Sequence, residues 1–210
     1  MLYVTRRPVV MTLLLSFTTC AAVGGAVAGL VPTPKNLKGS IVNDVYKSAD
    51  GSFQVTCPQE QGSYEYKYME VKEDYRPRVA TVTFGPAAFD RAIYRADVGV
   101  APDLPLETVA QRAIDAWRAD VEKSYGTALV PIGNSGTEIN GRQAITWTFS
   151  QSVPARRGIL NTYAAETVVH EVTVINGGKL LAILWVGTPQ SCNACKGKSA
   201  AFINSFQFVR

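Results

Sequence analysis

Residues 106–126 read LETVAQRAIDAWRADVEKSYG, and this stretch carries the clearest periodicity in the chain. Apolar residues recur in it at steps of three and four, which is the spacing of one face of an amphipathic helix. They are Leu106, Val109, Ala110, Ala113, Ile114, Trp117 and Val121. Pro105 suits the first turn, and Gly126 suits the C-terminal cap because glycine adopts a left-handed conformation without steric cost. The pattern predicts one long helix.

The sequence before this helix has the two-residue period of β-strands. Four strands are expected there, and they are Phe53–Cys57, Tyr64–Lys72, Val79–Phe84 and Ala92–Val100. Residues 29–50 have no such period, and their prolines and glycines favour a flexible tether. We therefore expect ordered structure to begin near Gly51.

Two turn signals follow the helix, Asn140-Gly141 and Asn176-Gly177-Gly178. Asn-Gly favours the positive φ angles of a tight hairpin, so each signal predicts a pair of antiparallel strands. The strands expected around the turns are Arg142–Gln151, Tyr163–Ile175 and Lys179–Val186. A short helix over Ser191–Asn204, with Ala201 and Phe202 facing inward, and an extended piece over Phe206–Val209 are expected to end the chain.

These elements predict an α+β fold: an antiparallel β-sheet packed with one long central helix and a short C-terminal helix. Their order resembles the PsbP-like α/β/α sandwich family, a fold shared by PsbP, an extrinsic subunit of photosystem II, and a Ran-binding nuclear transport factor. Three motifs carry the resemblance, and they are Gly51–Val55 leading to Pro58, Ile139–Arg142 and Ala201–Phe206. The resemblance implies a domain over residues 51–210 that binds partner proteins, and its bacterial relatives are exported or lipid-anchored.

The N-terminal segment predicts export. Arg6 and Arg7 precede an apolar stretch, which is how a segment enters a membrane with its N-terminus in the cytoplasm. Residues 1–28 are interpreted as a signal peptide cleaved after Ala28 or as an uncleaved membrane anchor. A third hypothesis is lipidation at Cys20, which resembles a bacterial lipoprotein although Phe17-Thr18-Thr19 departs from that pattern. The arginine pair also resembles a twin-arginine export signal.

This segment places the protein in the periplasm or at the outer face of the inner membrane. The formal net charge is +4, and the arginines and lysines form pairs rather than a clustered stripe, so no nucleic-acid partner is expected. The expected partner is another envelope protein. Contact with the membrane is expected through the N-terminal segment if that segment is uncleaved or lipidated.

Three cysteines lie in the domain. Cys192 and Cys195 form a C-x-x-C at the expected start of a helix, where the helix dipole favours a reactive thiolate. They also suit a structural disulfide in an oxidising compartment, either with each other or with Cys57 bridging one of them. A zinc site with His170 as the fourth ligand is a further hypothesis. A single histidine within a strand is more often a hydrogen-bonded packing residue.

Little in the chain indicates hydrolysis or a cofactor. No Gly-x-Ser-x-Gly elbow or phosphate-binding glycine loop occurs in the domain, and Glu166 and Glu171 fall on opposite faces of a strand. The main hypothesis is a non-catalytic protein-binding or assembly module. The alternative is a thiol–disulfide or metal-dependent activity centred on the C-x-x-C pair.

Two surfaces are candidate protein interfaces. One is an aromatic stripe, which is typical of interfaces because tyrosine joins apolar area to a polar tip. It consists of Tyr64, Tyr66 and Tyr68. The other is the loop over residues 151–161, which carries Arg156 and Arg157.

Overall fold

The computed structural model describes residues 39–58, 71–76, 79–85, 92–157 and 162–209. Four predicted features lie outside these ranges, and they are the export segment, lipidation at Cys20, most of the strand Tyr64–Lys72, and the tyrosine stripe Tyr64, Tyr66 and Tyr68. No helix among the described residues is long and apolar enough to cross a membrane.

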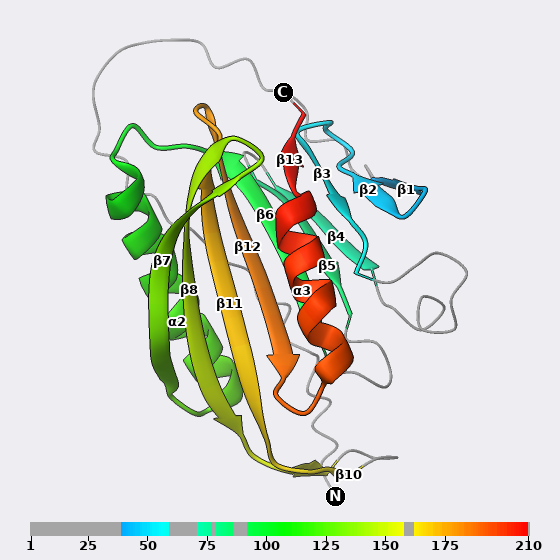
Figure 1. Cartoon of the computed structure of the whole chain (residues 1–210), viewed down its shortest axis with the longest axis vertical. Coiled ribbons are helices and arrows are strands. Elements are labelled where there is room, and N and C mark those ends of the chain that lie inside the picture. The colour runs from blue at the N-terminus through cyan, green and yellow to red at the C-terminus, as the bar shows by residue number, and fades with distance from the viewer. Residues whose placement is uncertain (1–38, 59–70, 77–78, 86–91, 158–161, 210) are drawn as a thin grey trace, which may run out of the picture.

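A seven-stranded antiparallel sheet forms the centre of the molecule (Figure 1). Its strands, in spatial order, are β4 (Val71–Arg76), β5 (Val79–Phe84), β6 (Ile93–Val100), β12 (Leu180–Pro189), β11 (Glu166–Asn176), β8 (Arg142–Val153) and β7 (Leu129–Ile139). A four-stranded sheet lies beside it and contains, in order, β1 (Ser40–Val42), β2 (Val45–Lys47), β3 (Phe53–Thr56) and β13 (Gln207–Phe208). The short strands β9 (Arg156–Arg157) and β10 (Thr162–Tyr163) pair with each other.

Helix α2 (Leu106–Tyr125) confirms the helix expected from the apolar period. Every residue of the predicted stripe from Val109 onward is buried. Gly126 ends the helix at φ 71°, and its N–H donates to the carbonyl oxygen of Glu122. The stripe packs on the side chains of β8, β11 and β12 that face it, which form one apolar core with Trp117.

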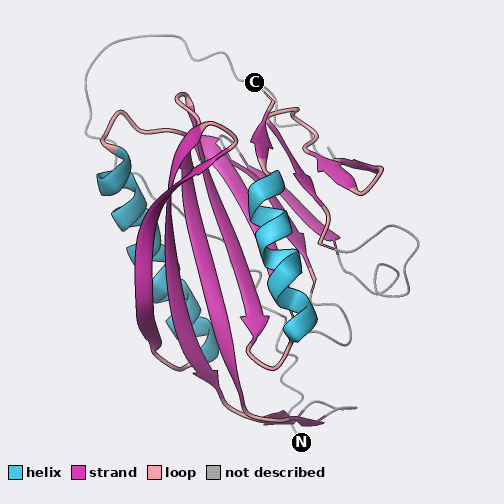
Figure 2. Ribbon diagram, in the orientation of Figure 1, coloured by secondary structure: helices cyan, strands magenta, loops and turns pink. Residues whose placement is uncertain are grey.

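Helix α3 (Asn193–Ser205) covers the other face of the same sheet (Figure 2). On β12, Leu181, Ile183 and Trp185 belong to the core under α2. The alternate residues Ala182, Leu184 and Val186 belong to the core under α3. Since neighbouring side chains of a strand point to opposite faces, the two helices sandwich β12. The apolar run of this strand follows from burial on both faces.

The inward face of α3 differs in one residue from the prediction. Phe202 is buried as expected, whereas Ala201 is exposed and Ile203 is buried in its place. The interpretation of Ala201 as a core residue was therefore wrong. The helix turns its larger apolar side chains to the sheet, because they remove more area from water than an alanine does.

Ordered structure begins before Gly51, so the predicted tether over residues 29–50 was wrong for its second half. Strands β1 and β2 form a hairpin there, with Asn43 and Asp44 at positive φ in the turn. Tyr46 anchors the hairpin: it is fully buried, and its ring centroid lies 5.8 Å from those of both Phe53 and Phe84. The sequence of this hairpin shows no hydrophobic period, because the hairpin buries only one large side chain.

Both predicted hairpin turns are present. Asn140 and Gly141 join β7 to β8 with φ angles of 48° and 76°, which is the left-handed pair that a two-residue turn needs. Asn176 is the last residue of β11, and Gly177 and Gly178 lie in the connection from β11 to β12. The two turns meet the chain end at the same edge of the molecule, because Phe208 packs against Gly177.

Gly177 tests this close approach. A Cβ atom at this position would lie 2.7 Å from the ring of Phe208, so Gly177→Ala must displace that ring. We expect a loss of about 1–2 kcal/mol in the free energy of unfolding, measured by urea denaturation. The matched control is Gly136→Ala on β7, where an added Cβ meets nothing within 4 Å. Equal stability of the two variants would contradict the packing described.

Candidate functional site

A pocket of about 200 Å³ lies where the β7–β8 turn meets the C-terminal end of the chain. Its lining has buried apolar residues, a half-buried phenylalanine and exposed polar residues. The lining residues are Ile139, Ile175, Phe206, Phe208, Asn140, Arg142 and Gln207. We call this site the terminal pocket. Three parts of the chain that are far apart in sequence build it: the β7–β8 hairpin, the end of β11, and β13 with the residue before it.

Asn140 fastens the hairpin to the end of α3. Its side-chain nitrogen Nδ2 donates to the carbonyl oxygens of Asn204 at 3.0 Å and Phe206 at 2.8 Å. The last carbonyls of a helix lack partners within the helix, so these two bonds satisfy acceptors that would otherwise need water. The same residue holds the left-handed turn position. Asn140 therefore shapes one side of the terminal pocket.

The opposite side of the pocket is held by the four-stranded sheet. Residues Gln207 and Phe208 pair with Gln54 and Phe53 of β3. Phe206 stacks on Phe53 with ring centroids 5.7 Å apart, and it meets Phe208 edge-on at 5.0 Å. Gln54 Nε2 also donates to Gln207 Oε1 at 2.9 Å. These contacts position both phenylalanines of the lining before any ligand arrives.

The accessible surface of the pocket is mainly polar and carries one positive charge. Arg142 is the only charged residue in the lining, and Asn140 and Gln207 add two carboxamides. Ile139, Ile175 and Phe206 are almost wholly buried, so they expose little apolar surface to the pocket. The terminal pocket therefore offers a ligand mainly polar groups, among them the guanidinium of Arg142.

The cysteines form a closed pair and a buried thiol. Cys192 and Cys195 are joined in a disulfide at the first turn of α3, with their Cα atoms 5.4 Å apart. The sequence left two kinds of disulfide pairing open, and the structure contains the Cys192–Cys195 disulfide. Cys57 is a free thiol. Burial, and secondarily the carboxylate of Asp44, raises the pKa of the Cys57 thiol to about 12. A thiolate at Cys57 is therefore disfavoured near neutral pH.

The zinc hypothesis is contradicted. Cys57 and Cys195 belong to the core under α3, whereas His170 contacts Trp117 and Trp185 of the core under α2. The sheet thus separates the histidine from the cysteines, and two of the required thiols are in a disulfide. Among the described residues, no group of three histidine, cysteine, aspartate or glutamate side chains is placed to hold a metal ion.

His170 is a hydrogen-bonded packing residue, as the sequence indicated. Trp185 Nε1–H donates to His170 Nδ1 at 3.1 Å, which assigns the proton to Nε2. His170 Nε2 then donates to Gln151 Oε1 at 3.0 Å, and Gln151 Nε2 donates to the carbonyl oxygen of Thr127 at 2.8 Å. Burial lowers the pKa of His170 to about 4, so the ring is neutral at pH 7.

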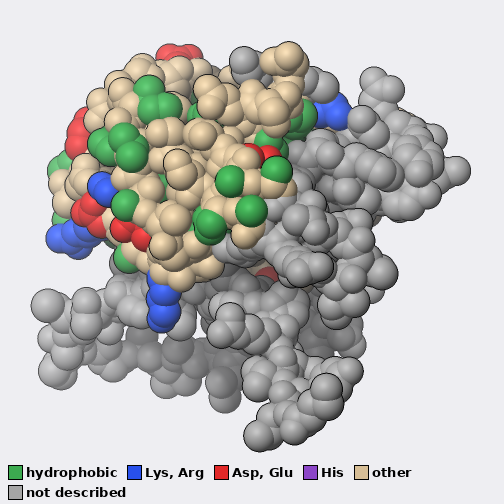
Figure 3. All heavy atoms as spheres, turned by 90° about the horizontal axis from the view of Figure 1, so that it is seen from below, with side chains coloured by type: hydrophobic (Ala, Val, Ile, Leu, Met, Phe, Trp, Pro, Cys, Tyr) green, Lys and Arg blue, Asp and Glu red, His purple; other side chains and the backbone are tan. Residues whose placement is uncertain are grey.

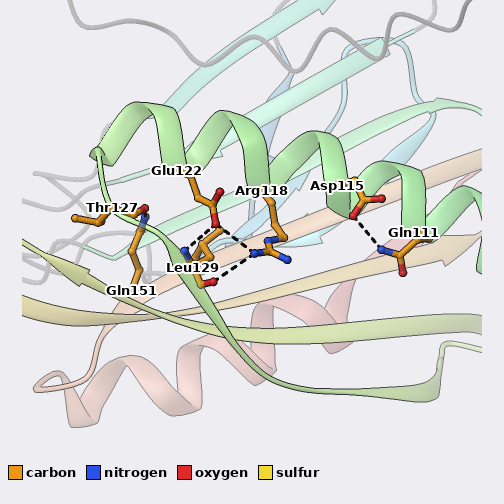
Figure 4. Close-up of polar contacts among 7 residues, drawn as sticks. All are labelled: Gln111, Asp115, Arg118, Glu122, Thr127, Leu129 and Gln151. Atoms are coloured by element: carbon orange, nitrogen blue, oxygen red, sulfur yellow. Dashed lines mark hydrogen bonds and ion pairs between the residues drawn. The ribbon is translucent and has the colours of Figure 1, made fainter.

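A polar cluster at the end of α2 was not found from the sequence (Figure 4). The backbone N–H of Leu129 donates to Glu122 Oε1 at 2.9 Å and lowers the pKa of that carboxyl group. Arg118 Nη2 donates to the same oxygen at 3.3 Å and to the carbonyl oxygen of Leu129 at 3.4 Å. These bonds fasten the helix to the first residue of β7. None of these residues lines the terminal pocket, and their bonds join two secondary-structure elements, so we assign them a structural role.

The two predicted interface arginines lie far from the terminal pocket. Arg156 and Arg157 form β9, which extends the β8–β11 pair at the opposite end of the sheet (Figure 1). Figure 3 views the molecule from that end, and on its described part acidic and basic side chains are interspersed with apolar ones. Because β9 lies at the opposite end of the sheet, the structure does not bring Arg156 and Arg157 together with the pocket residues.

The sequence singled out Asn140 as a hairpin turn residue and, together with Arg142, as part of the motif Ile139–Arg142, whereas Gln207 was named only within the extended piece Phe206–Val209. Sequence reasoning therefore missed the terminal pocket. The motif Ile139–Arg142 was the one available clue, since three of its four residues line the pocket.

No protein-family model matches the sequence, and no curated protein sequence does. The fold is similar to that of cyanobacterial PsbP (CyanoP) from Synechocystis sp. PCC 6803, with a TM-score of 0.50, 13% identity, and coverage of 88% of this chain and 98% of CyanoP. The yeast Ran-binding protein Mog1p (Saccharomyces cerevisiae) aligns with a TM-score of 0.45 and 13% identity, covering 81% of this chain and 97% of Mog1p. A Bacteroides thetaiotaomicron protein aligns with a TM-score of 0.46 and 8% identity, over 80% of this chain and 49% of that one.

Acidification tests the neutral state of His170. Its pKa is lower in the fold than the unperturbed 6.5, so the unfolded chain binds the proton more tightly. Stability from this group is therefore present above pH 6.5 and is lost as the pH falls toward 4. Between pH 7 and 4 we expect the free energy of unfolding of the wild type to fall by about 3 kcal/mol more than that of His170→Gln.

Urea denaturation at several pH values measures this difference. Glu171 contributes with the opposite sign, because burial raises its pKa, and comparing the two proteins cancels that contribution. Parallel pH profiles for the wild type and His170→Gln would show that residue 170 does not carry the effect.

Proposed function

We propose that this chain, which has the PsbP-like fold, is a non-catalytic protein-binding module of the bacterial cell envelope, and that the terminal pocket is its binding site. The observation that supports the proposal most directly is the lining of that pocket. It supplies four apolar side chains, two carboxamides and one guanidinium. Hydrogen bonds and the positive charge of this set can hold and orient a ligand.

The rigid construction of the pocket favours recognition of a partner. Asn140 ties one side to α3, and pairing with β3 fixes the other side. A site that is formed before binding loses little conformational entropy when the partner binds, whereas flexible surfaces must become ordered and bind more weakly for that reason. The pocket also lies beside two exposed hairpin turns, where a partner chain has access to it.

The envelope location is carried by the N-terminal sequence alone. Arg6 and Arg7 before the apolar stretch favour export, with cleavage after Ala28, retention as an anchor, or lipidation at Cys20 as the three outcomes. The Cys192–Cys195 disulfide is compatible with an oxidising compartment. We propose the periplasm or the outer face of the inner membrane, and another envelope protein as the partner.

The remaining interface candidates are proposed as secondary contacts. Tyr64, Tyr66 and Tyr68 lie outside the described residues, and Arg156 and Arg157 are described by their backbone only. A partner that spans the sheet from the terminal pocket to β9 would contact both ends of the molecule.

Site-specific photo-crosslinking in the native cells tests the proposed function. A p-benzoylphenylalanine residue in place of Gln207 should give a light-dependent adduct of protein size, because position 207 lies at the pocket and is exposed. The matched control carries the same probe in place of Gln111, which is exposed on α2 across the sheet. No adduct at position 207, or equal adducts at both positions, would contradict the proposal.

Intact mass of the protein from the envelope fraction tests export in the same cells. A mass that begins at Gly29, a diacylglycerol adduct on Cys20, or the full chain in the membrane each agrees with the proposed location. The full, unmodified chain recovered from the cytoplasm would exclude it.

A further inference from the structure

We infer that the Cys192–Cys195 disulfide is redox-active: it exchanges with the two thiols of a dithiol protein, and Cys192 carries the sulfur that is attacked. The pair lies at the first turn of α3, and the terminal pocket lies at the other end of the same helix (Figure 1). The exchange therefore goes beyond the proposed function and does not depend on it. It is supported by the unequal exposure of the two cysteines, by the charge at the start of α3, and by the contacts that hold this helix without the disulfide.

The two cysteines differ in accessibility. Cys195 is fully buried in the core under α3, whereas Cys192 is only partly buried. Ser191 and Asn193 are exposed, so the chain on both sides of Cys192 lies at the surface. Thiol–disulfide exchange begins when a thiolate attacks one sulfur of the disulfide, and the attack requires access to that sulfur. An incoming thiolate therefore reaches Cys192, and Cys195 is the leaving group.

The start of α3 favours the reduced form of the pair. The first N–H groups of a helix have no partner within the helix, and they carry a partial positive charge. In α2 an acidic residue, Glu107, lies in the first turn, whereas the first turn of α3 has no acidic residue and no capping side chain. Reduction places a thiolate at the N-cap residue Cys192, where this charge stabilises it. A disulfide whose reduced form is stabilised is a stronger oxidant.

Helix α3 is held in place by contacts other than the disulfide. The backbone N–H of Cys192 donates to the carbonyl oxygen of Pro189 at 2.9 Å, and the N–H of Cys195 donates to the carbonyl oxygen of Cys192 at 3.2 Å. Ser199 Oγ donates to the carbonyl oxygen of Cys195 at 2.9 Å. The helix and its C-cap also bury three large apolar side chains against the sheet, and they are Phe202, Ile203 and Phe206.

The disulfide itself constrains the chain little. It joins residues three apart in the sequence. In the chain-entropy model, the stabilisation by a disulfide grows with the length of the loop that it closes, so a loop this short contributes little. The hydrogen bonds and core contacts of α3 remain when the disulfide opens. We therefore expect the fold to persist on reduction, as reversible exchange with a partner requires.

The exchange proceeds in two steps. In the first, a thiolate of the dithiol protein attacks Cys192 Sγ and forms a mixed disulfide, while the Cys192–Cys195 bond breaks and its electron pair, with a proton, goes to Cys195 Sγ. In the second, the other thiolate of the dithiol protein attacks its own sulfur in the mixed disulfide, and Cys192 leaves as a thiolate. The dithiol protein is oxidised by two electrons to a disulfide, the Cys192–Cys195 pair is reduced by the same two electrons, and the second proton goes to water.

Equilibration of the full chain with reduced glutathione, without denaturant, tests the inference. After an acid quench the thiols are alkylated in urea and located by peptide mass spectrometry, and circular dichroism before the quench monitors the fold. Cys57 is a thiol in both states and serves as the internal reference. We expect Cys192 and Cys195 to become alkylated while the fold is retained. A structural disulfide resists glutathione, so a pair that opens only after urea unfolds the protein would contradict the inference.

Single variants identify the attacked sulfur. Cys195→Ser leaves the thiol of Cys192, and the matched control Cys192→Ser leaves the thiol of Cys195. With oxidised glutathione we expect the mixed disulfide to form about tenfold or more faster in Cys195→Ser, because its thiol is accessible. Urea should slow this reaction about threefold, because unfolding removes the helix end that favours the thiolate. Equal rates in the two variants, or a faster reaction of Cys195→Ser in urea, would overturn the role of Cys192.

A reduced dithiol peptide, Gly-Cys-Gly-Gly-Cys-Gly, tests the complete exchange. With the wild type we expect one peptide disulfide for each Cys192–Cys195 pair that opens, and with the double variant Cys192→Ser/Cys195→Ser we expect none above the rate of air oxidation. A peptide that stays reduced in the presence of the wild type would overturn the inference. The crosslink at position 207 is a separate readout: its absence contradicts the proposed function and leaves the redox activity of the disulfide standing.

Discussion

The pairing of β13 with β3 is the constraint on which the rest of the structure depends. It joins Gln207 and Phe208, near the end of the chain, to Gln54 and Phe53, near the start of the described domain. The pairing draws α3 across one face of the large sheet and places Phe206 against Phe53. It also places Phe208 over Gly177 at the β11–β12 turn. The terminal pocket is the space that remains between this returning segment and the β7–β8 hairpin.

The sequence was informative wherever local periodicity and turn chemistry act alone. The stripe of α2 and the turn at Asn140-Gly141 follow from local rules, and the structure confirms both. The β1–β2 hairpin could not be found in this way, because a single side chain, Tyr46, anchors it through rings far along the chain. The orientation of α3 likewise depends on which apolar side chains the sheet can accommodate.

The terminal pocket lay beyond sequence reasoning for a related physical reason. Arg142 and Gln207 are far apart in the chain, and only the β13–β3 pairing brings them to one cavity. Asn140 was interpreted as a turn residue, which it is. Its second role, as donor to the carbonyl oxygens of Asn204 and Phe206, requires the end of α3 to be in place. Side-chain bonds between distant segments leave no periodic pattern to detect.

The most direct test of this account is native-state hydrogen exchange of Asn140→Gly. Glycine keeps the left-handed turn but removes the side-chain amide that holds α3 and β13. The variant therefore loses the hydrogen bonds of Asn140 without losing the turn. The account predicts about tenfold or more faster exchange of the backbone N–H groups of β13 and Val209, with unchanged exchange in the β8–β11 pair. Unchanged exchange at β13 and Val209 would show that Asn140 does not hold the pocket together.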